Sequence, residues 1–259
     1  CGGAGWWVRG RRAAVAALAG VALAAAAAIA AEPAIIARAR AFVGEEAALN
    51  ALRSVRYTGT VVTVEMTEGA KPSTVAIEIV FQHPEQQWLR ARAGDMTELT
   101  VLDGFQGWKR IESAKDRAQW RQMALPVDAV RRMRATTWSN LAYWRGLEAH
   151  GGRVEELGTK VVDGVTCEKI AFIHHPRISY HRYFDAATGR LVLTETETGE
   201  TIREQGELKV KGIRFPRTVV TTAKNARGQP VTVTMTFDTI MTNEPLPAAQ
   251  FQAPLQRPR

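Results

Sequence analysis

Short segments in which apolar and polar residues alternate fill most of the chain, and they limit its fold more than any other feature. The segment PVTVTMTF (230–237) is the plainest example, because Val, Val, Met and Phe alternate with threonines. A period of two places the two sets of side chains on opposite faces of a β-strand. Turn residues such as Glu68-Gly69, His83-Pro84 and Asp103-Gly104 separate the segments. The sequence therefore predicts an antiparallel, mainly β protein.

Two longer stretches have helical periodicity instead. The first follows Pro33, and Gly44 is expected to kink it; the second starts at Pro126. Such amphipathic helices need an apolar surface to cover. We therefore expect a mainly β (α+β) domain, with a single curved antiparallel sheet of about 11 strands covered by helices on its concave face. The apolar stripe of the second helix comprises Val127, Val130, Met133, Trp138 and Leu141.

The first thirty residues have the pattern of an export signal. A basic VRGRR stretch precedes an alanine-rich apolar run, and Ala28-Ile29-Ala30 supplies the small-x-small motif of a cleavage site. The alternative is a retained anchor, since about 18 apolar residues can just span a bilayer. We expect residues 1–30 to be a signal peptide, cleaved or retained, that directs residues 31–259 to the periplasm. We expect those residues to form one domain with an irregular C-terminal tail anchored by Phe251.

The charge distribution argues against nucleic-acid binding, and the cysteine content excludes a disulfide within residues 31–259. The net charge is +8, but Arg9, Arg11 and Arg12 lie in the predicted signal and the other basic residues form no cluster, so we expect no nucleic-acid partner. Cys167 is the single thiol of residues 31–259, which excludes an intramolecular disulfide there. It lies in an alternating segment, where we expect a buried small apolar residue rather than a nucleophile.

The segment RYFDAATGRLV raises the question of whether Asp185 is a catalytic carboxylate. Its spacing to Thr188 and Gly189 fits neither aspartic proteases nor phosphorylated ATPases. Aspartate, two small residues and a glycine with access to positive φ suit a short hairpin loop. We therefore interpret Asp185 as the first residue of a turn.

Other candidate chemistry is equally unsupported. His174 and His175 are adjacent on a predicted strand and point to opposite faces, and Pro176 separates them from His181, so we expect no metal site. The serines lie in no nucleophile motif, and the chain has no phosphate loop or dinucleotide fingerprint. We expect no enzyme activity and no cofactor.

Tryptophans are concentrated in the first half of residues 31–259. Two interpretations are open. They could fill a core, or a strongly curved sheet that two helices cannot fill could leave an aromatic-lined cavity for an apolar ligand. These tryptophans are Trp88, Trp108, Trp120, Trp138 and Trp144.

The order of several short motifs resembles that of the outer-membrane lipoprotein-sorting (LolA/LolB-like) protein family. HPEQQWLR resembles that family's segment of a basic residue and proline before an aromatic strand, and VLDGFQGWKRI resembles its DG…W hairpin. Later hairpins and the C-terminal segment are matched by VVDGVTCEKIAF, YFDAATGRLV, GIRFPRTV and NEPLPAAQFQAP. The resemblance implies a half-barrel of antiparallel strands with helices as a lid, over an apolar cavity that shelters acyl chains during periplasmic transport.

The resemblance also implies partners and a site. The partners are the acyl chains of lipoproteins or other lipids, an inner-membrane exporter and an outer-membrane acceptor. His83 occupies the position of an arginine that latches the lid in the family's carrier. The alternative function is an envelope sensor or protein-interaction domain of the same fold. We expect the cavity to be lined by Val62, Val64, Ile77, Ile79, Phe81, Trp88 and Trp108, under a lid that carries Trp138 and Leu141.

Overall fold

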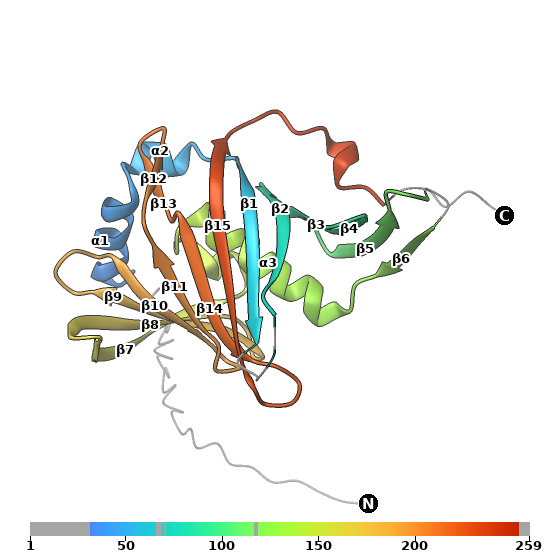
Figure 1. Cartoon of the computed structure of the whole chain (residues 1–259). Helices are drawn as coiled ribbons and strands as arrows, with labels where there is room; N and C mark the ends of the chain where they lie inside the picture. Colours follow the sequence, from blue (N-terminus) through green and yellow to red (C-terminus); the bar gives the residue numbers. More distant parts are fainter. Residues whose placement is uncertain (1–31, 66–68, 70, 117–118, 254–259) are drawn as a thin grey trace, which may run out of the picture. The chain divides into compact units, whose positions relative to one another are not determined.

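The computed structural model describes residues 32–65, 69, 71–116 and 119–253 (Figure 1). The predicted signal peptide, residues 1–30, lies outside the described residues. Within those ranges, no helix combines the length and apolar character needed to cross a lipid bilayer. The rest of this section concerns the compact unit that begins at Pro33.

An open antiparallel sheet of thirteen strands forms most of this unit. The first described strand pairs with the last, so β1 and β15 lie side by side at its middle (Figure 1). In sheet order, the strands are β6 (Trp120–Ala124), β5 (Gln106–Ser113), β4 (Met96–Asp103), β3 (Gln86–Ala93), β2 (Ser73–Gln82), β1 (Ser54–Glu65), β15 (Pro230–Thr242), β14 (Thr218–Lys224), β11 (Thr201–Gln205), β10 (Leu191–Thr196), β9 (Ile178–Asp185), β8 (Val165–His175) and β7 (Arg153–Val162). A separate hairpin consists of β12 (Leu208–Val210) and β13 (Ile213–Phe215).

The mainly β class and the antiparallel sheet are confirmed, but the predicted count of about 11 strands was too low. Strand β6 was missed, and two alternating segments are each divided into two strands. Gly206 divides β11 from β12 with a φ of +65°, and Pro216, which lacks an N–H to donate, divides β13 from β14. The divisions send β12 and β13 out of the main sheet.

Three α-helices accompany the sheet: α1 (Ala34–Val43), α2 (Glu46–Asn50) and α3 (Val127–Ala142). Two short 3-10 helices, η1 (Leu147–His150) and η2 (Ala248–Gln250), follow later in the chain. The predicted kink at Gly44 is a complete break between α1 and α2, and a Cβ atom at Gly44 would lie 2.9 Å from the carbonyl oxygen of Gly212. Helix α3 begins after Pro126 as predicted, but Val127 is 65% exposed, so the buried stripe starts at Val130.

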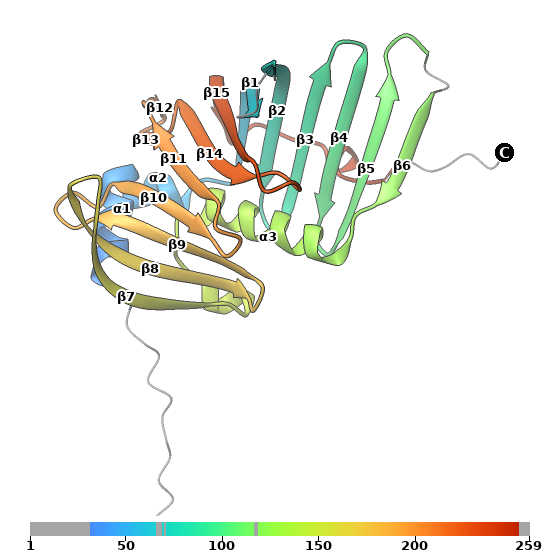
Figure 2. The same ribbon diagram turned by 60° about the horizontal axis from the view of Figure 1, so that its bottom comes forward.

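Helix α3 lies across one face of the sheet and packs against strands from both of its halves (Figure 2). Its neighbours include β3 and β9, which are seven strands apart in the sheet order. In a flat sheet, that separation would be about 33 Å. Because a helix of 16 residues is only about 24 Å long, the sheet must bend around α3.

The two faces of the sheet have separate hydrophobic cores. The main core lies between the helices and the sheet and includes Ile35, Leu141 and Phe184. A smaller one lies on the opposite face of β2 to β5, where Trp108 Nε1 donates a hydrogen bond of 3.2 Å to the carbonyl oxygen of Phe251. Phe251 is fully buried, so its predicted role as the anchor of the C-terminal segment is confirmed. The smaller core consists of Val80, Trp88, Val101, Trp108 and Phe251.

Asp185 is the first residue of the turn between β9 and β10, as predicted. One carboxylate oxygen accepts hydrogen bonds from the backbone N–H groups of Ala187 at 2.9 Å and Thr188 at 3.3 Å, and the other accepts one from the Thr188 hydroxyl at 2.8 Å. The Thr188 hydroxyl, followed by the Ala187 N–H, lowers the pKa of this carboxyl. Gly189 has a φ of +79°, which completes the hairpin.

Cys167 is fully buried and carries a free thiol, in agreement with the prediction. Burial raises the pKa of this thiol, with Asp185 adding to the effect. A raised pKa keeps the sulfur in its unreactive thiol form at neutral pH.

Candidate functional site

A cavity of about 610 Å³ lies between α3 and the face of the sheet that bends around it. Its lining comes from α1, α3 and strands across the full middle of the sheet, from β3 to β9. Small-molecule sites in proteins commonly measure about 300–1,000 Å³. Apolar side chains form much of its wall, and they include Ile79, Phe81, Leu89, Val219, Met235 and Phe237.

Strand alternation explains why these residues line the cavity. On β2, Ile79 and Phe81 face α3, while Val80 between them belongs to the smaller core on the other face. Gln87 and Leu89 do the same on β3, on either side of Trp88. Along these parts of β2 and β3, every second residue therefore faces the cavity, as the alternation in their sequences requires.

One cation borders the cavity from β9. Arg182 is only 7% exposed, and its Nη2 donates a hydrogen bond of 3.0 Å to the Ser139 hydroxyl on α3. Its guanidinium carbon lies 5.9, 5.2 and 5.6 Å from the ring centres of Trp144, Phe172 and Tyr180, within cation–π range. Burial lowers the pKa of Arg182 to about 10, so the side chain stays positively charged at neutral pH.

One carboxylate borders the same cavity from β11. Protein surrounds the Glu204 carboxyl, yet the residue is accessible to water because it faces the cavity. Burial raises the pKa of Glu204, and the positive charge of Arg182 partly opposes this rise. Arg190, Arg214 and Glu207 also border the cavity but are exposed, so Arg182 is the buried charge of its largely apolar wall.

Helix α3 is attached to the sheet along its length. Halfway along the helix, Arg134 forms two hydrogen bonds with Glu85 in the β2–β3 turn, at 2.7 and 3.0 Å. Further along, the fully buried Thr137 donates to the side-chain oxygen of Gln87 at 3.2 Å. At its end, the guanidinium of Arg40 on α1 donates to the carbonyl oxygens of Ala142 and Tyr143 at 2.7 and 3.0 Å.

The structure brings together part of the predicted lining. Ile79 and Phe81 line the cavity. Ile77, Trp138 and Leu141 belong to the main core between α3 and the sheet. They pack in this core and are not among the residues that line the cavity.

Four other predicted residues lie on the opposite face of the sheet or away from the cavity. Val62 and Val64 alternate with Val61, which packs on the main core, so they face the other side of β1. Trp88 and Trp108 contact Phe251 in the smaller core. The VVTV pattern places valines on both faces of β1, and Trp88 and Leu89 place apolar side chains on both faces of β3, so the sequence does not define which face points inward. The C-terminal segment covers the second face.

His83 lies in the β2–β3 turn, which is also the turn that α3 contacts. Burial lowers its pKa, with nearby Arg53 and His150 adding to the effect. The ion pair to α3 is made by Glu85, two residues later, and His150 Nδ1 lies 3.4 Å from the same carboxylate. A carboxylate in the turn and an arginine on the helix therefore provide this attachment.

The polar residues of the cavity were not predicted from the sequence. A signal for Arg182 is present: in ISYHRYFD, Arg182 shares a strand face with Tyr180 and Phe184, so it places a charge in an apolar row. Glu204 gives no comparable signal, since its neighbours on the strand are polar.

His174 has a structural environment rather than a metal-binding one. Its ring packs at 5.1 Å from that of Trp138 and 5.4 Å from that of Tyr180. Burial lowers its pKa to about 3, which makes it neutral at ordinary pH. Within the described ranges, no cluster of three or more His, Cys, Asp or Glu residues could hold a metal ion.

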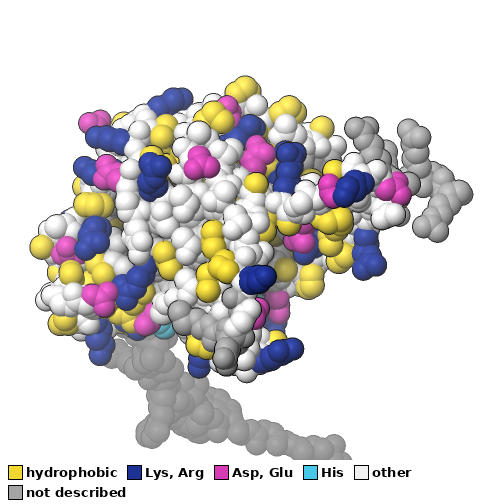
Figure 3. All heavy atoms as spheres, viewed as in Figure 1, with side chains coloured by type: hydrophobic (Ala, Val, Ile, Leu, Met, Phe, Trp, Pro, Cys, Tyr) yellow, Lys and Arg dark blue, Asp and Glu magenta, His cyan; other side chains and the backbone are white. Residues whose placement is uncertain are grey.

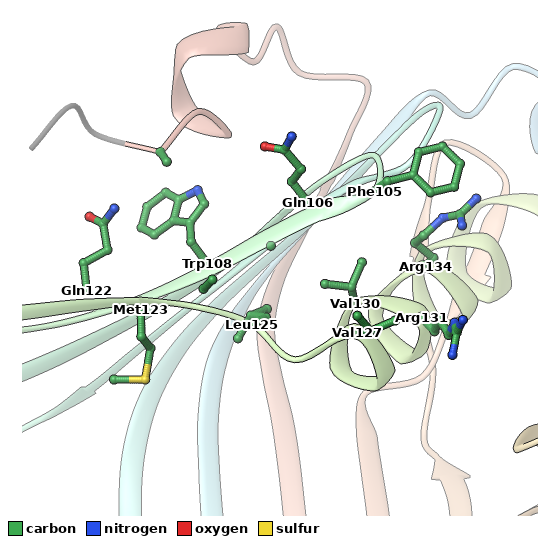
Figure 4. Close-up of a pocket in the computed structure, with 13 residues that line it drawn as sticks. Phe105, Gln106, Trp108, Gln122, Met123, Leu125, Val127, Val130, Arg131 and Arg134 are labelled. Atoms are coloured by element: carbon green, nitrogen blue, oxygen red, sulfur yellow. The ribbon is translucent and has the colours of Figure 1, made fainter.

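A second hollow, of about 720 Å³, lies outside the main cavity, between β5, β6 and the first half of α3 (Figure 4). Phe105, which is 77% exposed, and Val127 contribute to its wall. Its two arginines are already engaged, because Arg131 pairs with Asp128 at 3.2 Å and Arg134 pairs with Glu85. This hollow is an open surface groove with a mixed lining of apolar and polar groups.

Charged side chains are mixed in sign on the molecular surface. On the face shown in Figure 3, Lys and Arg side chains alternate with Asp and Glu and do not gather into a basic patch. Many are paired across strands, as Lys109 is with Glu98 at 2.7 Å. Such a face has no extended positive field of the kind that binds nucleic acid.

Comparison with solved structures identifies the fold. A DUF1329 family protein from Desulfovibrio piger superposes with a TM-score of 0.55 at 9% identity, covering 85% of this chain and 96% of that one. A LolA superfamily protein from Nitrosomonas europaea gives 0.55 at 10%, covering 83% and 97%. A protein from Vibrio parahaemolyticus, described as a putative outer membrane lipoprotein-sorting protein domain, gives 0.53 at 9%, covering 84% and 94%.

The chain therefore has the LolA-like fold. No protein-family model matches its sequence, and no curated protein matches it either. At 9–10% identity the superpositions establish the fold alone. Function must be argued from the cavity itself.

Proposed function

We propose that this protein is a periplasmic carrier that shelters acyl chains of lipoproteins or other lipids in the cavity beneath α3. The observation that carries the proposal is a hollow of about 610 Å³ with a largely apolar wall, placed between a helix and a bent sheet. The likeness in fold to a LolA superfamily protein and to a lipoprotein-sorting domain supports it.

The energetics of this function need no catalytic group. Each methylene removed from water contributes about 0.8 kcal/mol, so one long acyl chain supplies ample affinity. Helix α3 acts as the lid, and the ion pair between Arg134 and Glu85, beside His83, acts as its latch. An inner-membrane exporter loads the cavity and an outer-membrane acceptor empties it, because the cargo moves to whichever cavity binds it more strongly.

The carrier function is tested by a substitution that fills the cavity with a larger side chain. Val219 on β14 lines it, and Val220, the next residue, faces the other side of the strand. We expect Val219→Trp to weaken binding of a fluorescent acyl probe by at least about tenfold, equivalent to some two buried methylenes. Val220→Trp adds the same bulk outside the cavity and should leave the affinity unchanged. Equal affinities in wild type and Val219→Trp, or no saturable binding at all, would contradict the carrier function.

A protein-interaction or sensor domain is the second candidate, and the groove in Figure 4 is the observation that favours it. Phe105, Val127 and Met123 expose apolar surface there, and exposed apolar patches often mark protein contacts. A partner retained by Val219→Trp but lost by Phe105→Ser would support this candidate. Retention by both variants would exclude the groove.

A further inference from the structure

We propose that the cavity selects amphiphiles with an anionic headgroup, a carboxylate or a phosphate at the end of a long hydrocarbon chain, and that Arg182 binds this headgroup beneath α3. The inference rests on the carrier function and specifies its class of cargo. It starts from a buried cation whose hydrogen-bonding capacity is only partly used.

The Nε–H group of Arg182 is the unused donor. It is buried and has no hydrogen-bond partner in the part of the chain that the structure describes. The same guanidinium donates from Nη2 to Ser139 only, at 3.0 Å. A buried donor without a partner is unfavourable, more so when it is charged. An anionic oxygen entering the cavity would satisfy it with a charge-assisted hydrogen bond.

The neighbouring groups favour an anion at this place. Ser139 accepts from Arg182, so its own hydroxyl hydrogen is free to be donated to a ligand oxygen. The other two polar residues of α3 at the cavity are already bonded within the helix: Thr136 donates to the carbonyl of Arg132, and Asn140 donates to that of Thr136. Arg182 and Ser139 therefore form a two-donor site at the underside of the lid helix.

The carboxyl of Glu204 does not reverse this preference. The Arg182 side chain keeps its proton at neutral pH, since its pKa is about 10. Burial raises the pKa of Glu204 and thereby disfavours the charged form of its carboxyl, while the positive charge of Arg182 opposes this rise. Within the described chain, the side-chain hydrogen bond of Arg182 goes to Ser139 and not to Glu204, so no bond between the two charges must break before an anion binds. Glu204 acts on Arg182 through its charge alone.

The apolar wall of the cavity binds the hydrocarbon chain of the amphiphile. Ile79, Phe81 and Leu89 line the cavity from β2 and β3, and Val219 and Met235 line it from β14 and β15. A chain lying along these strands with its headgroup under α3 buries hydrocarbon and satisfies Arg182 in one binding event. The rings of Trp144, Phe172 and Tyr180 hold the guanidinium in place from β8, β9 and the segment after α3.

The experiment measures binding of four ligands with the same C16 chain to the delipidated protein by calorimetry: palmitate, hexadecyl phosphate, hexadecanol and hexadecyltrimethylammonium. We expect at least one anion to bind about tenfold or more tightly than hexadecanol, as a charge-assisted hydrogen bond in a buried site provides. The stronger anion indicates whether a fatty acid or a phospholipid is the source.

Three variants assign the preference to Arg182. Arg182→Met should reduce binding of the anions to the level of hexadecanol while leaving hexadecanol itself unchanged, which also shows that the variant is folded. Arg182→Lys should keep part of the preference. Arg203→Met is the control, because Arg203 pairs with Asp163 on the opposite face of β11, and it should behave as wild type.

Three results would overturn the inference. They are equal binding of hexadecanol and both anions, tightest binding of the cationic ligand, or an anion preference that survives in Arg182→Met. In each of these cases, the carrier function itself would stand, since the chains still bind. Absence of binding by all four ligands would instead overturn the carrier function and this inference with it.

Discussion

Gly189, in the turn between β9 and β10, joins a local backbone requirement to a tertiary contact. Its φ of +79° lies in the left-handed region that favours glycine. A Cβ atom added there would lie 2.6 Å from the backbone carbonyl of Arg38 on α1. The loop that Asp185 begins therefore fits against the first helix only if its glycine has no side chain.

Gly189→Ala separates these two requirements when it is compared with Gly164→Ala. Gly164 lies in the β7–β8 turn with a φ of +80° and has no atom within 4 Å of an added Cβ. We expect Gly164→Ala to lower the free energy of unfolding by about 1 kcal/mol, the cost of the left-handed backbone. Gly189→Ala should lower it by about 2–3 kcal/mol, because the α1 backbone must also move.

Urea denaturation of the two variants measures the difference. Equal losses of stability would show that the hairpin loop moves away from α1 at no cost, and would contradict the tight contact.

At the scale of elements, Arg40 connects α1, α2 and the end of α3. It is 2% exposed, forms a two-point contact with Glu46 on α2 at 2.8 and 3.0 Å, and donates to the last carbonyls of α3. Carbonyl groups at a helix end have no partners within the helix, so a buried cation there serves as the cap. The lid helix is thus fixed at its end by a residue about a hundred positions earlier.

Arg40→Met tests this cap. We expect a loss of about 2–3 kcal/mol in the free energy of unfolding, because buried carbonyls lose charged donors. Arg38→Met is the control on the same helix: it loses a partly exposed ion pair with Glu168 and an exposed hydrogen bond to the carbonyl oxygen of Ala186, and it should cost below about 1 kcal/mol. Similar losses in both variants would argue against Arg40 as a cap.

Acid titration of wild type and Arg40→Met provides a second test of the contact between Arg40 and Glu46. The hydrogen bonds from Arg40 are the largest cause of the lowered pKa of Glu46. A lowered folded-state pKa contributes stability above the unfolded pKa of about 4.3, and this contribution is lost as pH falls through the folded value. Wild type should therefore lose more stability than Arg40→Met between pH 7 and pH 3.

At the scale of the whole described unit, the two faces of the sheet have different environments. One face borders the cavity, and the other is closed over β2 to β5 by the C-terminal segment with Phe251. The cavity lining and the smaller core share no residue, because successive strand residues point to opposite sides. Stability and binding should therefore be separable by mutation.

Phe251→Ala is the complement of Val219→Trp. We expect it to lower the free energy of unfolding by about 3 kcal/mol and to change the fluorescence of Trp88 and Trp108, because a large buried ring is removed. The affinity for the acyl probe should not change. A loss of affinity that matches the loss of stability would show that the two faces are coupled.

The amino-acid sequence by itself determined the class of fold, the strand and helix periodicities, the hairpin at Asp185 and the buried state of Cys167 and Phe251. These properties depend on local chemistry: alternation, turn residues and side-chain size act over a few residues. The same local information predicted Ile79 and Phe81 for the cavity wall.

Only the tertiary structure decided which face of each strand borders the cavity. Val62, Val64, Trp88 and Trp108 were assigned inward because they are apolar, but Trp88 and Trp108 are buried on the other face by the C-terminal segment, which no single strand encodes. It also decided the charges of the cavity, since Arg182 on β9 and Glu204 on β11 both border the space that the bent sheet encloses with α3. Contacts between distant residues depend on that bend, which no local pattern encodes.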